Sequence, residues 1–425
     1  MNNVVETDFY RLNHKNELFY QYLQIKIIMN IAVISNYSFP NGMAASNRII
    51  AYSKGLVANG DSVHLICVRP TDKYILNDKL PTSGCFNGIN YTYVTGRYKN
   101  KYKVFRAISL LSGFRFIYGA FKTMNFLDKN HFDAILFSDD APKAQWLYTK
   151  IGKIYCKKIL FIFDEYPVPI RHKLKTDIPF WKKTAYKFIL PSFSGYISIS
   201  QKLANYFCNF AYRPTHIMSI IVNTEKFTPQ TKNKFNELDF NLVYIGNMEL
   251  TKDNVNLIIE AFAKITIKYP NAKLQLYGTP NESTRIFLSE LINRLGLSER
   301  VFINKRVSSD KVPSILSTAR ILVSSQPNTK RAAGGFPTKL GEYLAMGIPT
   351  LISDVGENAA YIKPNEECFF AIPDSVDDYA QKLDYILSNY DKALEVAQRG
   401  QQLIINNYSH IAVGKKLHDF ILKIQ

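Results

Sequence analysis

The segment 334–349 holds the residues whose types and spacing point most directly to chemistry. Gly334 and Gly335 let the backbone approach a ligand closely, and Pro337 is tolerated in a first helical turn, which needs no N–H donor from it. Gly347 marks the expected end of the helix. Because unpaired N–H groups and the positive end of the helix dipole favour an anion, the segment predicts a loop and helix start that can hold a phosphate.

Two charged side chains extend this pattern. Lys339 adds a positive charge to the same helix start, and Glu342 follows Thr338 by one turn, on the same helical face. A carboxylate at that place can accept hydrogen bonds from both hydroxyls of a ribose while the helix start holds a diphosphate. The spacing therefore predicts a nucleotide-diphosphate site. The alternative, which these residues leave open, is an ordinary loop–helix connection with a glutamate on the helix surface.

Short apolar runs alternate with helical patterns through both halves of the chain. Apolar strands separated by helices are typical of a parallel sheet that is covered on both faces, so this order predicts an α/β fold. The expected strands are 31–35, 63–68, 134–137, 159–163 and 195–198 in the first half, and 241–245, 273–277, 301–303, 321–324 and 350–352 in the second.

The length of 425 residues exceeds what one hydrophobic core usually serves. We therefore expect two doubly wound, Rossmann-like domains that face each other across a cleft, with ligands at the carboxyl ends of the strands. The predicted parts are a tail over 1–28, either an upstream extension before Met29 or an amphipathic helix, a first domain over 29–222, a linker over 223–238, a second domain over 239–408 and a C-terminal helix over 409–425 that packs back on the first domain.

Composition narrows the class of protein. The five cysteines are scattered without CxxC spacing, which indicates neither a disulfide framework nor a zinc site and fits a cytoplasmic protein. The net charge of +18 is concentrated in the first half, where residues 29–225 hold 26 Lys and Arg against 11 Asp and Glu. No nucleic-acid-binding motif accompanies this surplus. The pattern favours an anionic membrane surface as the acidic partner.

A basic, aromatic segment before residue 108 is the expected membrane contact. Tyrosines and a phenylalanine separate its basic residues, and apolar residues at mostly helical spacing follow over 108–121. Such a flank is typical of interfacial membrane binding, which would place the protein at the inner face of the cell membrane. The alternative is a core-facing helix preceded by a solvated loop. The residues predicted to contact the membrane are Arg97, Lys99, Lys101, Lys103 and Arg106.

Further segments join the loop at 334–349 in one pattern. Residues 242–247 form a strand that ends in Gly-Asn before Lys252, and Pro40 and Gly42 lie in the loop after the first strand. Together these segments resemble the retaining, nucleotide-sugar-dependent glycosyltransferases of the two-domain GT-B architecture, particularly glycosyltransferase family 4, whose members build bacterial surface glycans. The resemblance covers about residues 29–424 and is more specific in the second half.

The resemblance implies a donor site on the second domain. Lys252 would bind the donor diphosphate and Glu342 the ribose. Two positions depart from the family, because its first glutamate falls on Gly334 and its diphosphate-binding arginine on Asn247; Lys330, Arg331 or Lys339 could supply the missing charge. The implied donor-binding residues are Gly42, Asn247, Lys252, Arg306, Gly334, Gly335, Phe336, Pro337, Thr338, Lys339 and Glu342.

The first domain is expected to supply the acceptor side of the cleft. Ser138 falls near a position where many relatives carry a histidine, so Ser138 and Asp139, with Lys252, are the predicted catalytic residues. The alternative roles for Ser138 and Asp139 are in a turn and a helix cap. The remaining predicted acceptor-side residues follow two strands and are Asp140, Asp164, Glu165 and Arg171.

The resemblance implies a hexosyltransferase that moves a sugar from a nucleotide-diphosphate donor, with retention, to a lipid-linked or polysaccharide acceptor. It implies neither a metal nor a cofactor besides the donor substrate, since the helix start and Lys252 would stabilise the leaving diphosphate. Two alternatives stay open: a nucleotide-sugar 2-epimerase, and a non-catalytic nucleotide-sugar-binding protein, suggested by Gly334 and Asn247. The residues do not determine the sugar, the base, the acceptor or the linkage.

Overall fold

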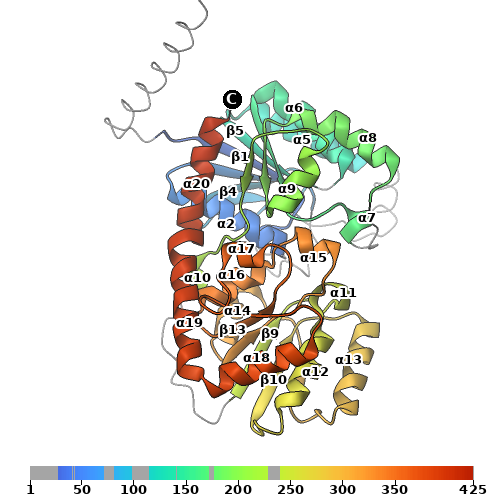
Figure 1. Cartoon of the computed structure of the whole chain (residues 1–425). Helices are drawn as coiled ribbons and strands as arrows, with labels where there is room; N and C mark the ends of the chain where they lie inside the picture. The colour runs from blue at the N-terminus through green and yellow to red at the C-terminus, as the bar shows by residue number, and fades with distance from the viewer. Residues whose placement is uncertain are drawn as a thin grey trace, which may run out of the picture.

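The computed structural model describes residues 27–40, 42, 44–70, 81–97, 114–139, 141–171, 177–227 and 240–424. These residues form two α/β halves, one above the other in Figure 1, each built around its own sheet. The predicted α/β fold with two parallel sheets is confirmed. The predicted tail over 1–28 lies almost wholly outside the described residues, as does most of the predicted linker over 223–238.

The first sheet has eight strands in the order β3-β4-β2-β1-β5-β6-β7-β8. Neighbouring strands are parallel except β3 and β4, which form an antiparallel hairpin. The strands are β1 (Asn30–Ser35), β2 (Ser62–Cys67), β3 (Ser83–Phe86), β4 (Ile89–Tyr93), β5 (Ala134–Ser138), β6 (Lys158–Phe163), β7 (Gly195–Ser198) and β8 (Thr215–Ile217).

Helices cover both faces of the first sheet. They are α2 (Ala44–Ala58), α5 (Phe114–Asp128), α6 (Pro142–Tyr155), α7 (Val168–Arg171), α8 (Phe180–Ile189), α9 (Gln201–Cys208) and α10 (Thr224–Phe227), with a 3₁₀ turn η1 (Leu190–Ser192). Because side chains alternate along a strand, Ile135 and Phe137 of β5 pack with Tyr148 of α6, whereas Leu136 packs on the opposite face with Tyr52 of α2.

The second sheet has six strands in the order β11-β10-β9-β12-β13-β14, and every pair is parallel. Its strands are β9 (Phe240–Ile245), β10 (Ala272–Tyr277), β11 (Val301–Asn304), β12 (Ile321–Val323), β13 (Thr350–Ser353) and β14 (Phe369–Ala371). Its helices are α11 (Leu250–Asp253), α12 (Val255–Ile265), α13 (Glu282–Arg294), α14 (Val312–Leu316), α15 (Lys330–Gly334), α16 (Thr338–Ala345), α17 (Asn358–Tyr361), α18 (Val376–Ser388) and α19 (Tyr390–Leu403), with a 3₁₀ turn η2 (Ser309–Lys311).

The C-terminal helix returns from the second half to the first. A π-helical turn η3 (Ile404–Tyr408) joins α19 to α20 (His410–Lys423), and α20 runs beside α2 along one edge of the molecule (Figure 1). The backbones meet at two glycines, since a Cβ on Gly414 would lie 2.4 Å or less from backbone atoms of Gly55. A buried hydrogen-bonding contact joins the two helices' surroundings, with His418 Nδ1 2.8 Å from Asp61 Oδ2.

Four strands lie outside the predicted set. β3 and β4 join through Asn87 and Gly88, both at positive φ, and this Asn-Gly pair is a hairpin signal that the sequence interpretation missed. β8 and β14 have three residues each, too few to show a period of two. Among the described helices, none combines the length and the apolar character that crossing a membrane requires.

The glycine contact between α2 and α20 generates a stability prediction. Gly414→Ala places a methyl group against the Gly55 backbone, so the two helices must separate, and we expect a loss of about 1–3 kcal/mol in the free energy of unfolding. Urea unfolding followed by circular dichroism measures this loss. Lys415→Ala, at the neighbouring exposed position of α20, is the control and should leave stability nearly unchanged. Equal stability of the two variants would contradict the close contact.

Candidate functional site

The segment predicted to hold an anion forms two short helices, α15 and α16, joined by a fixed loop. Pro337 is the N-cap of α16, so the helix begins at Thr338, one residue later than predicted. The loop is anchored by Phe336, whose buried ring meets the ring of Tyr361 edge to face at 5.9 Å between centroids. The first-turn N–H groups of α16 therefore lie at the end of an ordered loop, which is favourable for an anion.

Tyr166 explains the glycine at position 334. A Cβ on Gly334 would lie 2.0 Å from the Tyr166 ring, so no larger side chain fits while this ring stays in place. The Gly334 carbonyl also accepts a hydrogen bond from Ser200 Oγ at 2.7 Å. Tyr166 and Ser200 belong to the first half of the chain. The position where the resemblance expects a glutamate is thus a tight contact between the two halves.

Lys339 is engaged by a carboxylate within its own domain. Its Nζ lies 2.8 Å from Asp253 Oδ1 and 4.3 Å from the centroid of the Tyr244 ring. Burial alone raises the pKa of Asp253, but Lys339 and further hydrogen bonds outweigh burial, so the pKa lies below its ordinary value. Lys339 therefore neutralises Asp253. It does not stand unpaired at the start of α16, as the sequence interpretation expected.

Two other cations converge from the second domain on one carboxylate of the first. Lys252 Nζ lies 3.6 Å from Glu165 Oε1, and an Nη atom of Arg331 lies 3.5 Å from the same oxygen. Arg331 is nearly buried and also contacts Glu249 Oε1 at 3.0 Å. Lys252 belongs to α11, after β9, and Glu165 follows β6. Both therefore lie at carboxyl ends of parallel strands, where the two sheets face each other.

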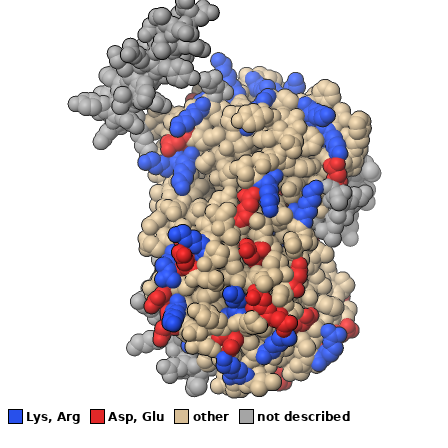
Figure 2. Space-filling view, viewed as in Figure 1, with Lys and Arg blue, Asp and Glu red and all other residues tan. Residues whose placement is uncertain are grey.

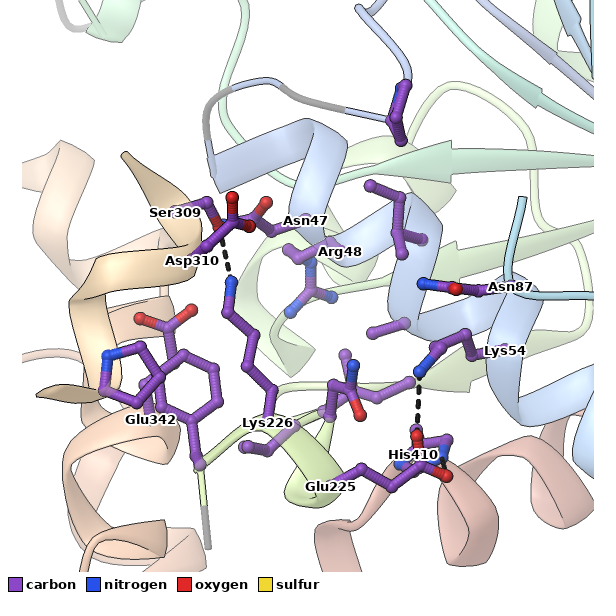
Figure 3. A pocket seen from close by; sticks show the side chains of 18 of the residues that line it. Asn47, Arg48, Lys54, Asn87, Glu225, Lys226, Ser309, Asp310, Glu342 and His410 are labelled. Carbon is purple, nitrogen blue, oxygen red and sulfur yellow. Dashed lines mark hydrogen bonds and ion pairs between the residues drawn. The ribbon is translucent and has the colours of Figure 1, made fainter. Parts of the chain in front are cut away.

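A cavity of about 1060 Å³ lies next to α16 and between the two halves. Thr338 and Glu342 of α16 line it from the second domain, together with residues of η2 and α14, while α2 lines it from the first domain. Lys226 of α10 reaches into the cavity between Glu342 and Asp310, and it donates a hydrogen bond to Ser309 Oγ (Figure 3). The volume suits a nucleoside-sized ligand.

Glu342 has an unusual protonation equilibrium in this cavity. Burial raises the pKa of its carboxyl to about 7, although Lys226 and Lys339 lower it in part. Burial also lowers the pKa of Lys226, against the opposing effect of Glu342 and Asp310. Glu342 is therefore a partly buried acceptor without a direct ion pair among the described residues, at the position where the resemblance places ribose binding.

Ser138 and Asp139 lie buried at the carboxyl end of β5. The Asp139 carboxylate accepts a hydrogen bond from the Ala141 N–H at 2.9 Å and lies 3.3 Å from an Nη atom of Arg69. Asp139 thus makes a turn contact, which was the alternative role expected for it, and also an ion pair with Arg69, which follows β2. Asp140 lies outside the described residues, and so does the side chain of Arg171.

Asp164 is held by a buried arginine of α2. Arg48 Nε lies 3.1 Å from Asp164 Oδ1, and the Arg48 guanidinium also donates to the carbonyls of Met218 and Ser219 at 2.7 and 3.2 Å. Asp164 thus connects the end of β6 to α2 and to the segment after β8. Of the predicted acceptor-side residues, the structure turns Asp164 inward and Glu165 toward the second domain.

Three predicted donor-site residues neither line the cavity nor take part in the contacts of Lys252 and Arg331 with Glu165. Asn247 and Arg306 are exposed and do not line the cavity. Gly42 lies in the loop before α2, where a Cβ would come 2.0 Å from Ser46 Oγ. The backbone there needs a glycine for packing.

Arg97 corrects the predicted membrane contact. Its side chain is buried, donates a hydrogen bond to the Pro81 carbonyl at 3.0 Å and lies over the Tyr93 ring at 5.3 Å. The guanidinium thus packs against β4 and the residues that precede β3. It therefore faces away from any lipid. The other residues of that prediction, Lys99, Lys101, Lys103 and Arg106, lie outside the described residues.

Lys226 was absent from the predicted site, because it stands in no recognisable spacing, and Tyr166 was expected only as part of the segment 164–167 on the acceptor side. Tyr166 reaches α15 and Lys226 reaches Glu342 only through the way the two halves meet. Within the described ranges, no group of three or more His, Cys, Asp and Glu side chains is arranged to hold a metal ion.

The raised pKa of Glu342 generates a pH prediction. An acid whose pKa is higher in the folded protein binds more protons folded than unfolded, so stability falls as pH rises from about 4.5 to about 7. Glu342→Gln removes this cost, and its stability relative to the parent should rise by about 3 kcal/mol across that window. Urea unfolding at several pH values measures the difference, with Glu395→Gln on exposed α19 as control. A difference that stays constant with pH would contradict the raised pKa.

Comparisons with known proteins agree with this geometry. Residues 226–403 match the model of the family described as "Glycosyl transferases group 1". An uncharacterized glycosyltransferase of Methanocaldococcus jannaschii is 23% identical over 175 residues, which span 41% of this chain and 43% of that relative. The match thus spans less than half the length of the curated relative.

Solved structures share the whole fold. Sucrose-phosphate synthase from Thermosynechococcus elongatus superposes with a TM-score of 0.71 at 15% identity, covering 93% of this chain and 98% of that one. HepE of Anabaena, solved in complex with UDP and glucose, gives a TM-score of 0.66 at 14% identity, covering 93% and 100%. The chain accordingly has the GT-B fold, and its second half is similar to the glycosyl transferases group 1 family.

Proposed function

We propose that this chain is a glycosyltransferase that moves a hexosyl group from a nucleotide-diphosphate sugar, with retention, to a lipid-linked or polysaccharide acceptor in surface-glycan synthesis. The observation that carries the proposal is the convergence of Lys252 and Arg331 on one oxygen of Glu165, next to the segment that begins α16. Two cations that share one anionic oxygen are arranged to receive a diphosphate. The group 1 domain and the UDP complex of HepE support a nucleotide-sugar donor.

In this proposal Arg331 supplies the charge that Asn247 lacks. The other candidates are placed less well, because Lys339 pairs with Asp253 and Lys330 lies over the Tyr166 ring at 5.9 Å. Arg331 is nearly buried and forms two carboxylate contacts, so its guanidinium is already oriented. An oriented guanidinium can donate two parallel hydrogen bonds to phosphate oxygens.

The proposed chemistry is electrostatic stabilisation of a leaving group. As the bond between the anomeric carbon and the diphosphate oxygen breaks, negative charge grows on the diphosphate, and Lys252, Arg331 and the start of α16 stabilise it. The acceptor hydroxyl forms the new bond to the anomeric carbon and passes its proton to the departing diphosphate oxygen. Glu342 holds the ribose from within the cavity, and the proposal assigns no step to a metal ion.

The two alternatives make different products. The matched family and the relative from Methanocaldococcus jannaschii are both described as glycosyltransferases, which does not favour the epimerase. Release of free nucleoside diphosphate together with a modified acceptor would establish transfer, whereas an epimerised nucleotide sugar would establish the epimerase. Nucleotide-sugar binding without either product would support the non-catalytic alternative.

The two cations that share Glu165, Lys252 and Arg331, generate the first functional prediction. Lys252→Ala and Arg331→Gln should each lower kcat/KM for the donor by about tenfold or more, because each removes a charged hydrogen bond to the leaving diphosphate. Release of nucleoside diphosphate at limiting donor measures the effect, after a nucleotide-sugar screen by thermal shift has found the donor. Lys392→Ala on exposed α19 is the control. Unchanged turnover in both site variants would remove the cation pair from the proposal.

Glu165 generates a prediction of opposite sign. Its carboxylate occupies the place between Lys252 and Arg331 that a diphosphate would take, so Glu165→Gln should tighten the binding of nucleoside diphosphate by about three- to tenfold. Calorimetry with the nucleoside diphosphate alone measures the dissociation constant, with Glu395→Gln as control. Weaker binding in Glu165→Gln would mean that this carboxylate aligns the two domains in the ligand-bound state and does not compete with the ligand.

A further inference from the structure

Three helices that lie side by side over one face of the first sheet turn an unusual surface outward. α6 contacts α5 on one side and α8 on the other, and all three pack on the same hydrophobic cluster under the sheet (Figure 1). Their inward residues are buried, as a core-facing helix requires. We define the α5/α6/α8 face by their exposed residues, which are Ile117, Tyr118, Phe121 and Lys122 of α5, Lys143, Trp146, Lys150, Lys153 and Ile154 of α6, and Phe180, Trp181, Lys187 and Phe188 of α8. Asp128, the last residue of α5, is exposed as well.

The exposed apolar residues of this face are large. Phe180, Trp181 and Phe188 are 84%, 63% and 76% exposed, and Trp146 is 53% exposed. Trp146 and Trp181 are the only two tryptophans of the chain. Aromatic residues normally dominate cores, so several of them exposed together on adjacent helices indicate a binding surface.

The face is also basic. α6 and α8 together contain six lysines and no acidic residue. Of these lysines, Lys182 is buried and Lys183 pairs with Asp177. Lys143, Lys150 and Lys153 recur on the same side of α6 as Trp146. Figure 2 shows Lys and Arg side chains along the end of the molecule where α6 and α8 lie, while Asp and Glu gather over the second half.

We propose that the α5/α6/α8 face docks the protein on an anionic lipid membrane. Lysines interspersed with exposed aromatic side chains on one face are what binding at a lipid interface needs, because the rings enter the boundary of the acyl chains while the ammonium groups meet the headgroup phosphates. A protein partner of the usual kind would instead meet an interface core depleted in lysine. The proposal goes beyond glycosyl transfer and rests on none of the donor-site residues.

The position of the α5/α6/α8 face is compatible with a donor site on the second half. The α5/α6/α8 face lies on the first half, whereas Lys252, Arg331 and Glu342 belong to the second. A membrane on this face would leave the second half and its cavity away from the lipid, open to a donor from solution.

The two tryptophans report on the proposal directly. The full chain is mixed, without nucleotide, with vesicles of phosphatidylglycerol and phosphatidylcholine or of phosphatidylcholine alone. We expect the tryptophan emission to shift to the blue only with the anionic vesicles, since no other tryptophan contributes to the signal. The single variants Trp146→Phe and Trp181→Phe show which ring enters the lipid. Emission that stays unchanged with both vesicle types would overturn the proposal.

Substitutions test the aromatic and the basic residues of the α5/α6/α8 face separately. Phe180→Ala combined with Phe188→Ala, and separately Lys150→Gln combined with Lys153→Gln, should each weaken sedimentation with anionic vesicles by about tenfold or more, and the lysine effect should fade at high salt. Ile267→Ala, at an exposed site of the second half, and Lys392→Gln are the matched controls. Circular dichroism verifies that each variant is folded.

Two further outcomes would overturn the proposal. If the emission is already blue-shifted without vesicles and depends on protein concentration, the face binds a second copy of the chain and the proposal is wrong. If the face variants sediment with anionic vesicles as strongly as the controls do, lipid binding occurs elsewhere and the proposal is equally overturned.

Discussion

The central strands of both sheets are buried on both faces, and this constraint decides where polar chemistry can take place. Along β5 and β6 nearly every side chain is in the core, so charged groups appear only where the strands end. Parallel strands end at the same edge of a sheet. Glu165 after β6 and Lys252 after β9 therefore meet across the boundary between the two halves, although they belong to different domains.

The charges at that boundary compensate one another. Arg331 is nearly buried, and a buried cation without a partner is costly, so its two carboxylate contacts with Glu249 and Glu165 are needed. Glu165 comes from the opposite domain, whereas Glu249 comes from the same one. A diphosphate brings its own negative charge and can therefore replace Glu165 without leaving Arg331 unpaired. The ion pair between the domains and the proposed leaving-group site are thus the same set of side chains.

The two faces of the first sheet are covered in different ways. On one face α20 packs so closely on α2 that two glycines are required, and the buried pair of Asp61 and His418 joins them. On the other face α5, α6 and α8 bury their inward residues but leave Trp146, Trp181 and several other large apolar residues in solvent. Core packing accounts for the first arrangement. The second arrangement leaves large apolar surface in solvent, which fits the membrane docking proposed above.

The sequence by itself determined the α/β class, the two parallel sheets and, to within one residue, the start of α16, because these depend on local periodicity and on where glycine and proline stand. The spacing of Glu342 from Thr338 predicted a ribose-binding carboxylate, and the family resemblance predicted Lys252 as a diphosphate ligand. Only the tertiary structure decided which cation stands beside Lys252. Lys330, Arg331 and Lys339 are equivalent by spacing, and the choice among them depends on Asp253, Glu165 and Tyr166, which are distant in the chain. The requirement for glycine at position 334 was also decided only by the tertiary structure, because the Tyr166 ring that excludes a side chain there belongs to the other domain.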